Sequence, residues 1–111
     1  MANTFKDAQV QLSGTTLVDV YQAPTTAGNV AIVLSILVAN VNGTSSADIT
    51  ISKTDASNTL LSQLAFTIPV PNDTSLEIVP NKIVLSAGEK IRAQASAGNF
   101  LHVTVSSLEI T

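Results

Sequence analysis

The stretch VAIVLSILVAN, residues 30–40, is the longest apolar run of the chain, and Asn42-Gly43 follows it closely. Because side chains alternate across an extended strand, this run divides into two rows. One row holds Ile32, Leu34, Ile36 and Val38, and the other holds Ala31, Val33, Leu37 and Ala39. Both rows are apolar, and the frequent β-branched residues favour a strand over a helix. We therefore predict a central strand that is covered on both faces.

The second apolar row needs a cover, because an antiparallel strand in a β-sandwich usually keeps one face in water. That cover is either another segment of the same chain or a neighbouring subunit. The run is far too short for a transmembrane helix, which needs about 20 apolar residues. The Asn42-Gly43 pair predicts a hairpin, in which a strand over residues 47–54 pairs with the central strand.

The composition indicates one small domain without special chemistry. The 111 residues predict a single domain over 1–111, in which residues 1–12 form an N-terminal arm or an edge strand. There is no cysteine, only 12% of the residues are charged, and the formal net charge is -3. The five basic residues are scattered, which argues against a nucleic-acid partner. The N-terminus lacks the apolar core of a signal peptide, so we expect a protein that is made in the cytoplasm and has no membrane partner.

Short apolar segments separated by turn residues continue along the whole chain. We predict strands over residues 5–12, 15–22, 30–40, 47–54, 60–70, 76–79, 83–85, 90–95 and 100–110. Many short strands at regular spacing are typical of a sandwich or a barrel. The predicted fold class is therefore all-β, an antiparallel β-sandwich of about eight short strands with jelly-roll or immunoglobulin-like topology.

Two of these segments leave alternatives open. Residues 60–70 place Leu64, Phe66, Ile68 and Val70 on one face of a strand, although a short helix over 59–66 is also compatible with the sequence. Pro69 favours a strand that ends there or lies at an edge of the sheet. The last strand changes parity between Val105 and Leu108, which indicates either a β-bulge at Ser106-Ser107 or a strand that passes from the core to a second contact surface.

Candidate chemical groups are few and isolated. His102 is the only histidine, and a metal site needs several ligands. Asp19 and Tyr21 fall on one face of a predicted strand, but no nucleophile or basic partner accompanies them. The aspartates at positions 48, 55 and 73 lie in or near turns, which Asp stabilises through its own backbone, and none has the spacing of an EF-hand. We therefore predict no catalytic residue, no cofactor, no metal site and no enzymatic activity.

Three motifs carry a family resemblance that covers nearly the whole chain. These are VYQAP at 20–24 with the loop and the apolar strand that ends in VAN at 38–40, LSAGEKI at 85–91, and VTVSSLEI at 103–110. This pattern resembles small structural proteins of tailed bacteriophages. The resemblance implies a β-sandwich virion component such as a head decoration (cement) protein, a neck protein or a fibre-associated module. Many such proteins are trimers, so it also implies a homotrimer without catalytic residues.

The leading hypothesis is a capsid decoration protein that stabilises the phage head by bridging neighbouring capsid subunits. Its expected partners are further copies of itself and the major capsid protein or another virion protein, and its expected location is the virion. We expect the contacts between its own subunits to involve Val33, Leu37, Leu108 and Ile110. We expect the capsid to contact Phe5, Pro24, Asn29 and Pro71. The alternative is a tail, neck or fibre-associated module that binds a host-surface ligand.

Overall fold

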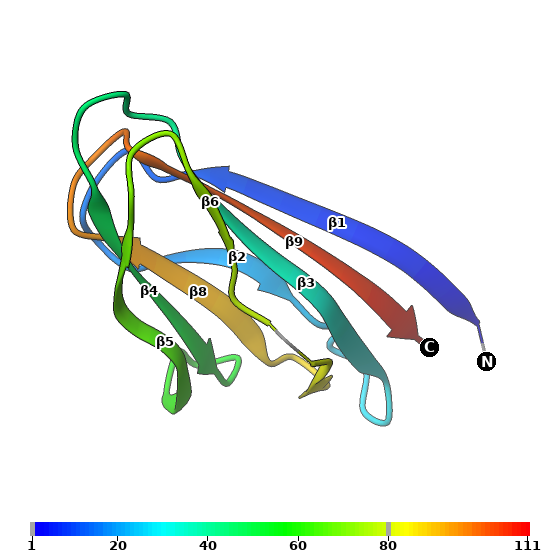
Figure 1. The fold of residues 1–111 in the computed structure, drawn as a ribbon. Coiled ribbons are helices and arrows are strands. Elements are labelled where there is room, and N and C mark those ends of the chain that lie inside the picture. Colours follow the sequence, from blue (N-terminus) through cyan, green and yellow to red (C-terminus); the bar gives the residue numbers. More distant parts are fainter. Residues whose placement is uncertain (1, 80) are drawn as a thin grey trace.

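Nine strands, and no helix, make up the part of the chain that the structure describes, which is residues 2–79 and 81–111 of a computed structural model (Figure 1). The strands are β1 (Asn3–Gln11), β2 (Val18–Gln22), β3 (Val30–Asn40), β4 (Ala47–Thr54), β5 (Leu60–Val70), β6 (Ser75–Glu77), β7 (Ile83–Ser86), β8 (Lys90–Ala95) and β9 (Leu101–Ile110). All their pairings are antiparallel. The prediction of an all-β antiparallel fold is confirmed.

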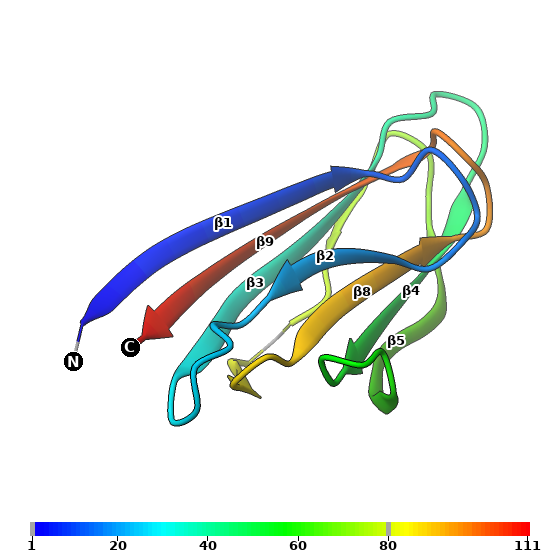
Figure 2. The same cartoon turned by 180° about the vertical axis from the view of Figure 1, so that it is seen from behind.

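The strands form two sheets that face each other (Figures 1 and 2). Sheet A has the order β1-β9-β3-β6, with β7 also paired to β3, and sheet B has the order β2-β8-β4-β5. The chain passes from one sheet to the other at every connection except β4–β5 and β6–β7. This is the order of a jelly roll, in which β6 and β7 together occupy one strand position. The jelly roll, and not the immunoglobulin-like alternative, is therefore the topology of this chain.

The core lies between the sheets and consists of the side chains that alternate inward from both of them. The largest of these side chains are fully buried and aliphatic: Val33, Ile36, Val38, Ile49, Ile51, Val70, Leu85, Ile91, Leu101, Val103 and Val105. Because the residues between them face outward, each sheet also presents an outer face. These two outer faces differ in chemistry, and the difference decides where the candidate interaction surfaces lie.

Leu34 is an extra residue in β3 that changes which side chains face the core. Val33 pairs with Ser107 and Ser35 pairs with Ser106, so Leu34 has no partner in β9. Before this bulge Val33 points inward, and after it Ile36 points inward. The predicted rows were therefore wrong, because a bulge shifts the alternation by one residue. The predicted bulge at Ser106-Ser107 was also wrong, since the bulge lies in the opposite strand and β9 alternates regularly.

The predicted hairpin at Asn42-Gly43 is wrong, because β4 pairs with β5 and β8 in the other sheet. A two-residue type I′ turn needs positive φ at both central residues. Neither Asn42 nor Gly43 is among the described residues with positive φ. Instead, the Asn42 side-chain oxygen accepts hydrogen bonds from the backbone N–H groups of Thr44 and Ser45, both at 2.8 Å. This geometry suits a connection between sheets.

β5 is an irregular edge strand, so the helix alternative is wrong. Three register shifts interrupt its pairing with β4, and Thr67 has a φ of 49°. As a result Ala65 and Val70 point inward, while Phe66 and Ile68 are exposed. The predicted single row of four apolar residues in this strand was therefore wrong. The prediction of an edge position, based on Pro69, is confirmed.

β1 is an edge strand of sheet A and not a free arm. It pairs with β9 without interruption from Asn3 to Gln11. At the end of this ladder, the N–H of Ala2 donates to the carbonyl of Thr111 at 2.7 Å, and the N–H of Thr111 donates back at 2.9 Å. The two ends of the described chain therefore lie side by side at one end of a molecule that measures 47 × 24 × 20 Å (Figure 1).

Candidate interaction surfaces

The outer face of sheet A is apolar over the half that lies nearest the chain ends. Residues that pair across an antiparallel ladder point to the same face, so the register places these side chains side by side. Phe5 pairs with Leu108, Ile32 pairs with both Leu108 and Val84, and Val30 pairs with Ile110. We call this set, together with Leu34, the apolar face: Phe5, Val30, Ile32, Leu34, Val84, Leu108 and Ile110. Its residues come from four strands.

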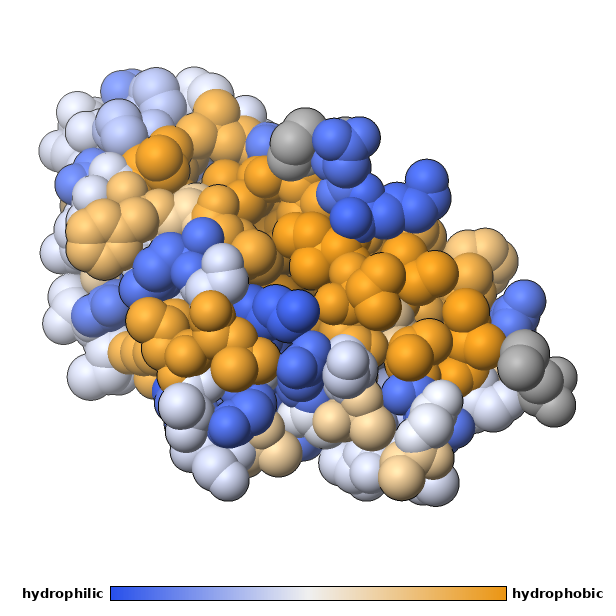
Figure 3. Space-filling model, turned by 90° about the horizontal axis from the view of Figure 1, so that it is seen from below, coloured by the Kyte–Doolittle hydropathy of each residue, from blue (hydrophilic) through white to orange (hydrophobic). Residues whose placement is uncertain are grey.

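Solvent reaches this set directly. Phe5 is 77% exposed and Val84 is 54% exposed, while the other members are half-buried. Figure 3 shows a broad hydrophobic area on the side of the molecule seen from below. Isolated exposed apolar residues are normal on a protein surface, but a contiguous group over four strands is typical of an interaction site.

The other half of the same sheet face is polar apart from Leu37, so the apolar face ends near the middle of the sheet. Further along β1 and β9 the outward residues are Asp7, Gln9, Gln11, Ser106, Thr104 and His102. His102 is half-buried over a shallow hollow that Gln9, Gln11 and Thr104 also line. No group of three or more potential metal ligands occurs among the described residues.

Glu77 secures the bulge that brings Leu34 to the surface. Its carboxylate accepts hydrogen bonds from the backbone N–H of Ile36 at 2.9 Å and from that of Val79 at 3.1 Å. The same carboxylate accepts a hydrogen bond from the hydroxyl of Ser35. A bulge leaves main-chain groups without their ladder partners, and this side chain supplies the missing acceptor.

Tyr21 and Glu109 close the inner side of sheet A beneath the apolar face. The phenol of Tyr21 donates to a carboxylate oxygen of Glu109 at 2.6 Å, and Tyr21 is only 8% exposed. Burial, and then the hydrogen bond to the carboxylate, raise the pKa of Tyr21 to about 12. Asp19 points to the outer face of sheet B, because a register shift lies between it and Tyr21. The prediction that Asp19 and Tyr21 share a face was therefore wrong.

The outer face of sheet B is charged over β2 and β8, whereas its edge strand β5 exposes Leu60, Leu61, Phe66 and Ile68. Asp19 forms ion pairs with Lys90 at 3.0 Å and with Arg92 at 2.6 Å. Partial burial acts to raise the pKa of Asp19, but the hydrogen bonds and charges of Lys90 and Arg92 outweigh it and lower that pKa. The charged strands of sheet B are well solvated, and its exposed apolar residues lie on the single strand β5. The apolar face of sheet A extends over four strands, so it is the stronger candidate for a protein contact.

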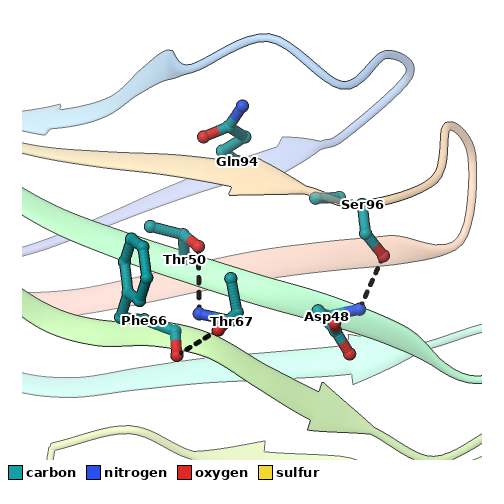
Figure 4. Close-up of a pocket in the computed structure, with 7 residues that line it drawn as sticks. Asp48, Thr50, Phe66, Thr67, Gln94 and Ser96 are labelled. Atoms are coloured by element: carbon teal, nitrogen blue, oxygen red, sulfur yellow. Dashed lines mark hydrogen bonds between the residues drawn. The ribbon is translucent and has the colours of Figure 1, made fainter.

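A shallow hollow of about 240 Å³ lies on the outer face of sheet B (Figure 4). Phe66, 63% exposed, stands beside it, and polar groups of Asp48, Thr50 and Gln94 line it. The backbone N–H of Thr67 donates to the Thr50 hydroxyl at 3.1 Å, which supports the left-handed backbone at Thr67. This hollow combines one aromatic ring with several hydrogen-bonding groups.

The structure redistributes the predicted contact residues. Val33 was predicted to contact a neighbouring subunit, but it is fully buried in the core, because the bulge follows it. Leu108 and Ile110 lie on the apolar face, together with Phe5, which the sequence analysis had assigned to a different surface. Leu37 is 41% exposed but pairs with Thr104 and Glu77, on the polar half of the sheet face.

The predicted capsid-contact residues lie at both ends of the molecule. Pro24 accepts a hydrogen bond from the N–H of Gly88, and Asn29 precedes β3, so both lie at the end that carries Phe5. Pro71 lies at the opposite end, where Asn72 donates to the carbonyl of Gly43. The structure therefore brings three of these four residues to one end and leaves Pro71 far from them.

Sequence reasoning missed four members of the apolar face, namely Val30, Ile32, Leu34 and Val84. The signal that could have found them is the second apolar row of residues 30–40, but its correct membership depends on the bulge. No helix among the described residues has the length and hydrophobicity needed to span a membrane.

Comparisons with known proteins find similarity in structure alone. No protein-family model and no curated protein matches the chain. A protein from the acidic stable capsid of Helicobacter pylori bacteriophage KHP30 superposes with a TM-score of 0.64 and 10% sequence identity, over 99% of this chain and 89% of that one. A protein from the disulfide-linked pili of Bacillus endospore appendages superposes with a TM-score of 0.54 and 13% identity, over 100% of this chain and 91% of that one. At such identities the likeness shows that the β-sandwich fold is shared.

Proposed function

We propose that this chain is a non-enzymatic structural protein of a phage virion, namely a head decoration protein that docks on the capsid through the apolar face. The observation that carries the proposal is the apolar face itself. Seven apolar residues from four strands meet water at one end of sheet A, and burying them in a contact is favourable.

The fold comparison supports the same role. The KHP30 capsid protein shares this fold over 99% of the present chain, and the superposition spans 89% of its own length. The two chains therefore match over nearly their full lengths. A small domain of this kind suits a component that is added to a shell, and the expected partner is the major capsid protein.

The mechanism is mechanical. Each copy buries apolar surface between neighbouring capsid subunits and raises the free-energy barrier to their separation. Specific contacts bury about 800 Å² per partner, over about 20–30 residues on each side. A docking contact of that size therefore extends beyond the seven residues of the apolar face. Pro24 and Asn29 lie at the same end and enlarge the contact. Because a shell offers many equivalent sites, a modest affinity at each site is sufficient.

A binding experiment with heads purified without the protein tests this proposal. The double variant Leu108→Asn with Ile110→Asn makes the apolar face polar, and we expect it to lose at least tenfold in affinity in co-sedimentation. The matched control, Thr104→Asn with Ser106→Asn, alters the polar half of the same strand and keeps the wild-type affinity. Equal binding by both double variants, or absence of the protein from purified virions, would refute the proposal.

The second candidate function is a tail or fibre-associated module that binds a host-surface saccharide. The hollow beside Phe66 favours it, because sugars bind shallow sites with an exposed aromatic ring and hydrogen-bonding side chains. Titration with host-surface glycans, followed by NMR, tests this function. Shifts confined to the hollow that disappear in Phe66→Ala, but persist in the control Leu61→Ala, would favour it over decoration. A pilus subunit is less well supported, since these 111 residues hold no cysteine for disulfide links.

A further inference from the structure

β1 is the longest sheet edge of the described chain with unbroken pairing, and its only protection against pairing with another strand is the charge of Lys6 and Asp7. Natural edge strands are short, bulged, charged or interrupted by proline. β5 has Pro69 and three register shifts, and β2 has five residues and a register shift. β6 and β7 have three and four residues. In contrast, β1 runs for nine residues without proline and in unbroken register with β9.

The register shows which main-chain groups of β1 point away from the sheet. Ala2 and Thr111 exchange both hydrogen bonds, and the N–H of Leu12 donates to the carbonyl of Leu101. Hydrogen-bonded pairs alternate along an antiparallel ladder, so the even-numbered residues of β1 bond to β9. The N–H and C=O groups of the odd-numbered residues therefore face outward: Asn3, Phe5, Asp7, Gln9 and Gln11. All five residues are exposed.

We propose that a second copy of this chain pairs with β1, antiparallel to it, about a two-fold axis at Ala8. Two-fold contacts are the commonest in homo-oligomers, and each copy supplies the same strand. The outward groups lie on odd-numbered residues, so only registers that pair odd with odd satisfy them. A register centred on Lys6 or Asp7 brings two like charges directly opposite each other, which is destabilising.

The register centred on Ala8 avoids both like-charge pairs. It places Asp7 opposite Gln9 and Phe5 opposite Gln11 of the second copy, and it overlaps the strands from Phe5 to Gln11. Four odd-numbered residues of each copy then complete their main-chain hydrogen bonds. The two A sheets become one continuous sheet, because the paired strands are antiparallel neighbours.

This dimer presents both apolar faces on one side. A two-fold axis that relates adjacent strands of one sheet runs perpendicular to it, so the outer faces of the two A sheets point the same way. The pairing itself does not depend on the proposed function. If the apolar face docks on a capsid, the dimer binds two neighbouring sites at once and gains affinity from being bivalent. A two-fold dimer then replaces the homotrimer that the family resemblance implies.

The native mass of the purified protein is the first test. Light scattering over a concentration series is expected to give twice the chain mass of 11.5 kDa. A mass of one chain or of three chains overturns the proposal. Hydrogen exchange adds a residue-level test, because the amides of Asp7 and Gln9 become protected only when the edge is paired. A dimer in which these two amides exchange freely also overturns it.

Cysteine cross-linking tests the register, since the chain has no other cysteine. The Ala8 pair is non-hydrogen-bonded across the proposed interface, so its Cα atoms lie about 4.5 Å apart, within the range for a disulfide. Ala8→Cys is expected to form a linked dimer on mild oxidation. The control Val10→Cys is not expected to form a linked dimer. In this register Val10 lies opposite Lys6 of the second copy, so the two cysteines are about 13 Å apart along the paired strands. Equal yields from both variants would refute the register.

Proline substitution tests the edge independently. Gln9→Pro removes an outward N–H that β9 does not use, which an edge strand tolerates. We expect at least a tenfold weaker dimer, while the matched control Gln9→Ala keeps the wild-type dimer. If Gln9→Pro dimerises as well as Gln9→Ala, the edge is not the interface. These results are independent of head binding by the apolar-face variants, so each proposal can fail alone.

Discussion

The Tyr21–Glu109 hydrogen bond illustrates how one polar pair is held at the border of an aliphatic core. The phenol reaches from sheet B to the inner side of sheet A and donates to a carboxylate at 2.6 Å. Burial disfavours the charged phenolate, and the neutral phenol is the form that donates to Glu109, so the pKa of Tyr21 rises to about 12. The pair therefore links the stability of the sandwich to pH in the alkaline range.

This linkage gives a prediction for the free energy of unfolding. With a folded pKa of about 12 and an ordinary value of 10.0, the contribution of Tyr21 is fully present below pH 10 and is lost as the pH rises to about 12. Urea denaturation at pH 8, 10 and 11.5 measures the loss. The variant Tyr21→Phe is expected to be about 1–2 kcal/mol less stable at pH 8 and to lack most of the alkaline decline. An unchanged decline in that variant would assign the effect to other groups.

At the scale of the element, β3 shows how one inserted residue reassigns a whole strand. Sequence periodicity places Leu34 and Ile36 in one row, whereas the structure leaves the first half-buried on the outer face and buries the second completely. Glu77 stabilises this arrangement, because its carboxylate accepts a hydrogen bond from the N–H of Ile36. The composition of the apolar face therefore depends on a side chain from β6, 41 residues along the chain from Ile36.

The position of the bulge in β3 predicts that substitutions at Leu34 and Ile36 lower the free energy of unfolding by different amounts. Ile36→Ala is expected to lower the free energy of unfolding by about 2–5 kcal/mol, because it leaves a cavity in the core. Leu34→Ala is expected to cost less, about 1 kcal/mol, since this side chain is only half-buried and lies on the outer face of the sheet. Paired urea denaturation curves measure both values. Similar costs for the two variants would contradict the position of the bulge.

Sequence patterns predicted the strands well and the sheet topology less well. β3, β4, β5 and β8 have the predicted bounds, because turn residues and alternation mark them locally. The partner of β4 was wrong, since a turn motif reports local geometry and not which sheet the next strand joins. The apolar face was found in part, through Leu108 and Ile110. Val33 was assigned wrongly because a bulge leaves no clear mark in an uninterrupted apolar run.

At the scale of the whole molecule, the two sheets differ in where their exposed apolar residues lie. Sheet B carries the Asp19 ion pairs with Lys90 and Arg92 and exposes apolar side chains along its edge strand β5, while the apolar face of sheet A extends over four strands. The net charge is only -3. A contact through sheet A should therefore depend on burial of apolar surface and little on long-range charge.

Salt dependence distinguishes these two kinds of contact. Raising NaCl from 0.1 to 1 M shortens the screening length from about 10 to about 3 Å and weakens exposed charge pairs. We expect the affinity for heads to change less than twofold, because apolar burial is not screened. Co-sedimentation at the two concentrations measures it. A tenfold loss at high salt would indicate docking through charged groups of sheet B instead.

The adjacent chain ends determine how the molecule responds to force. Ala2 and Thr111 bond to each other at the end of two antiparallel strands, so pulling on the termini would load that hydrogen-bonded pair first and then the next. Under such a load the hydrogen-bonded pairs between β1 and β9 break one after another, so the force needed is low. A load that enters sideways, across the edge of β1 or over the surface of sheet A, is instead shared by many rungs at once. A chain built this way resists a load applied across its flank and yields easily when it is pulled at Ala2 and Thr111.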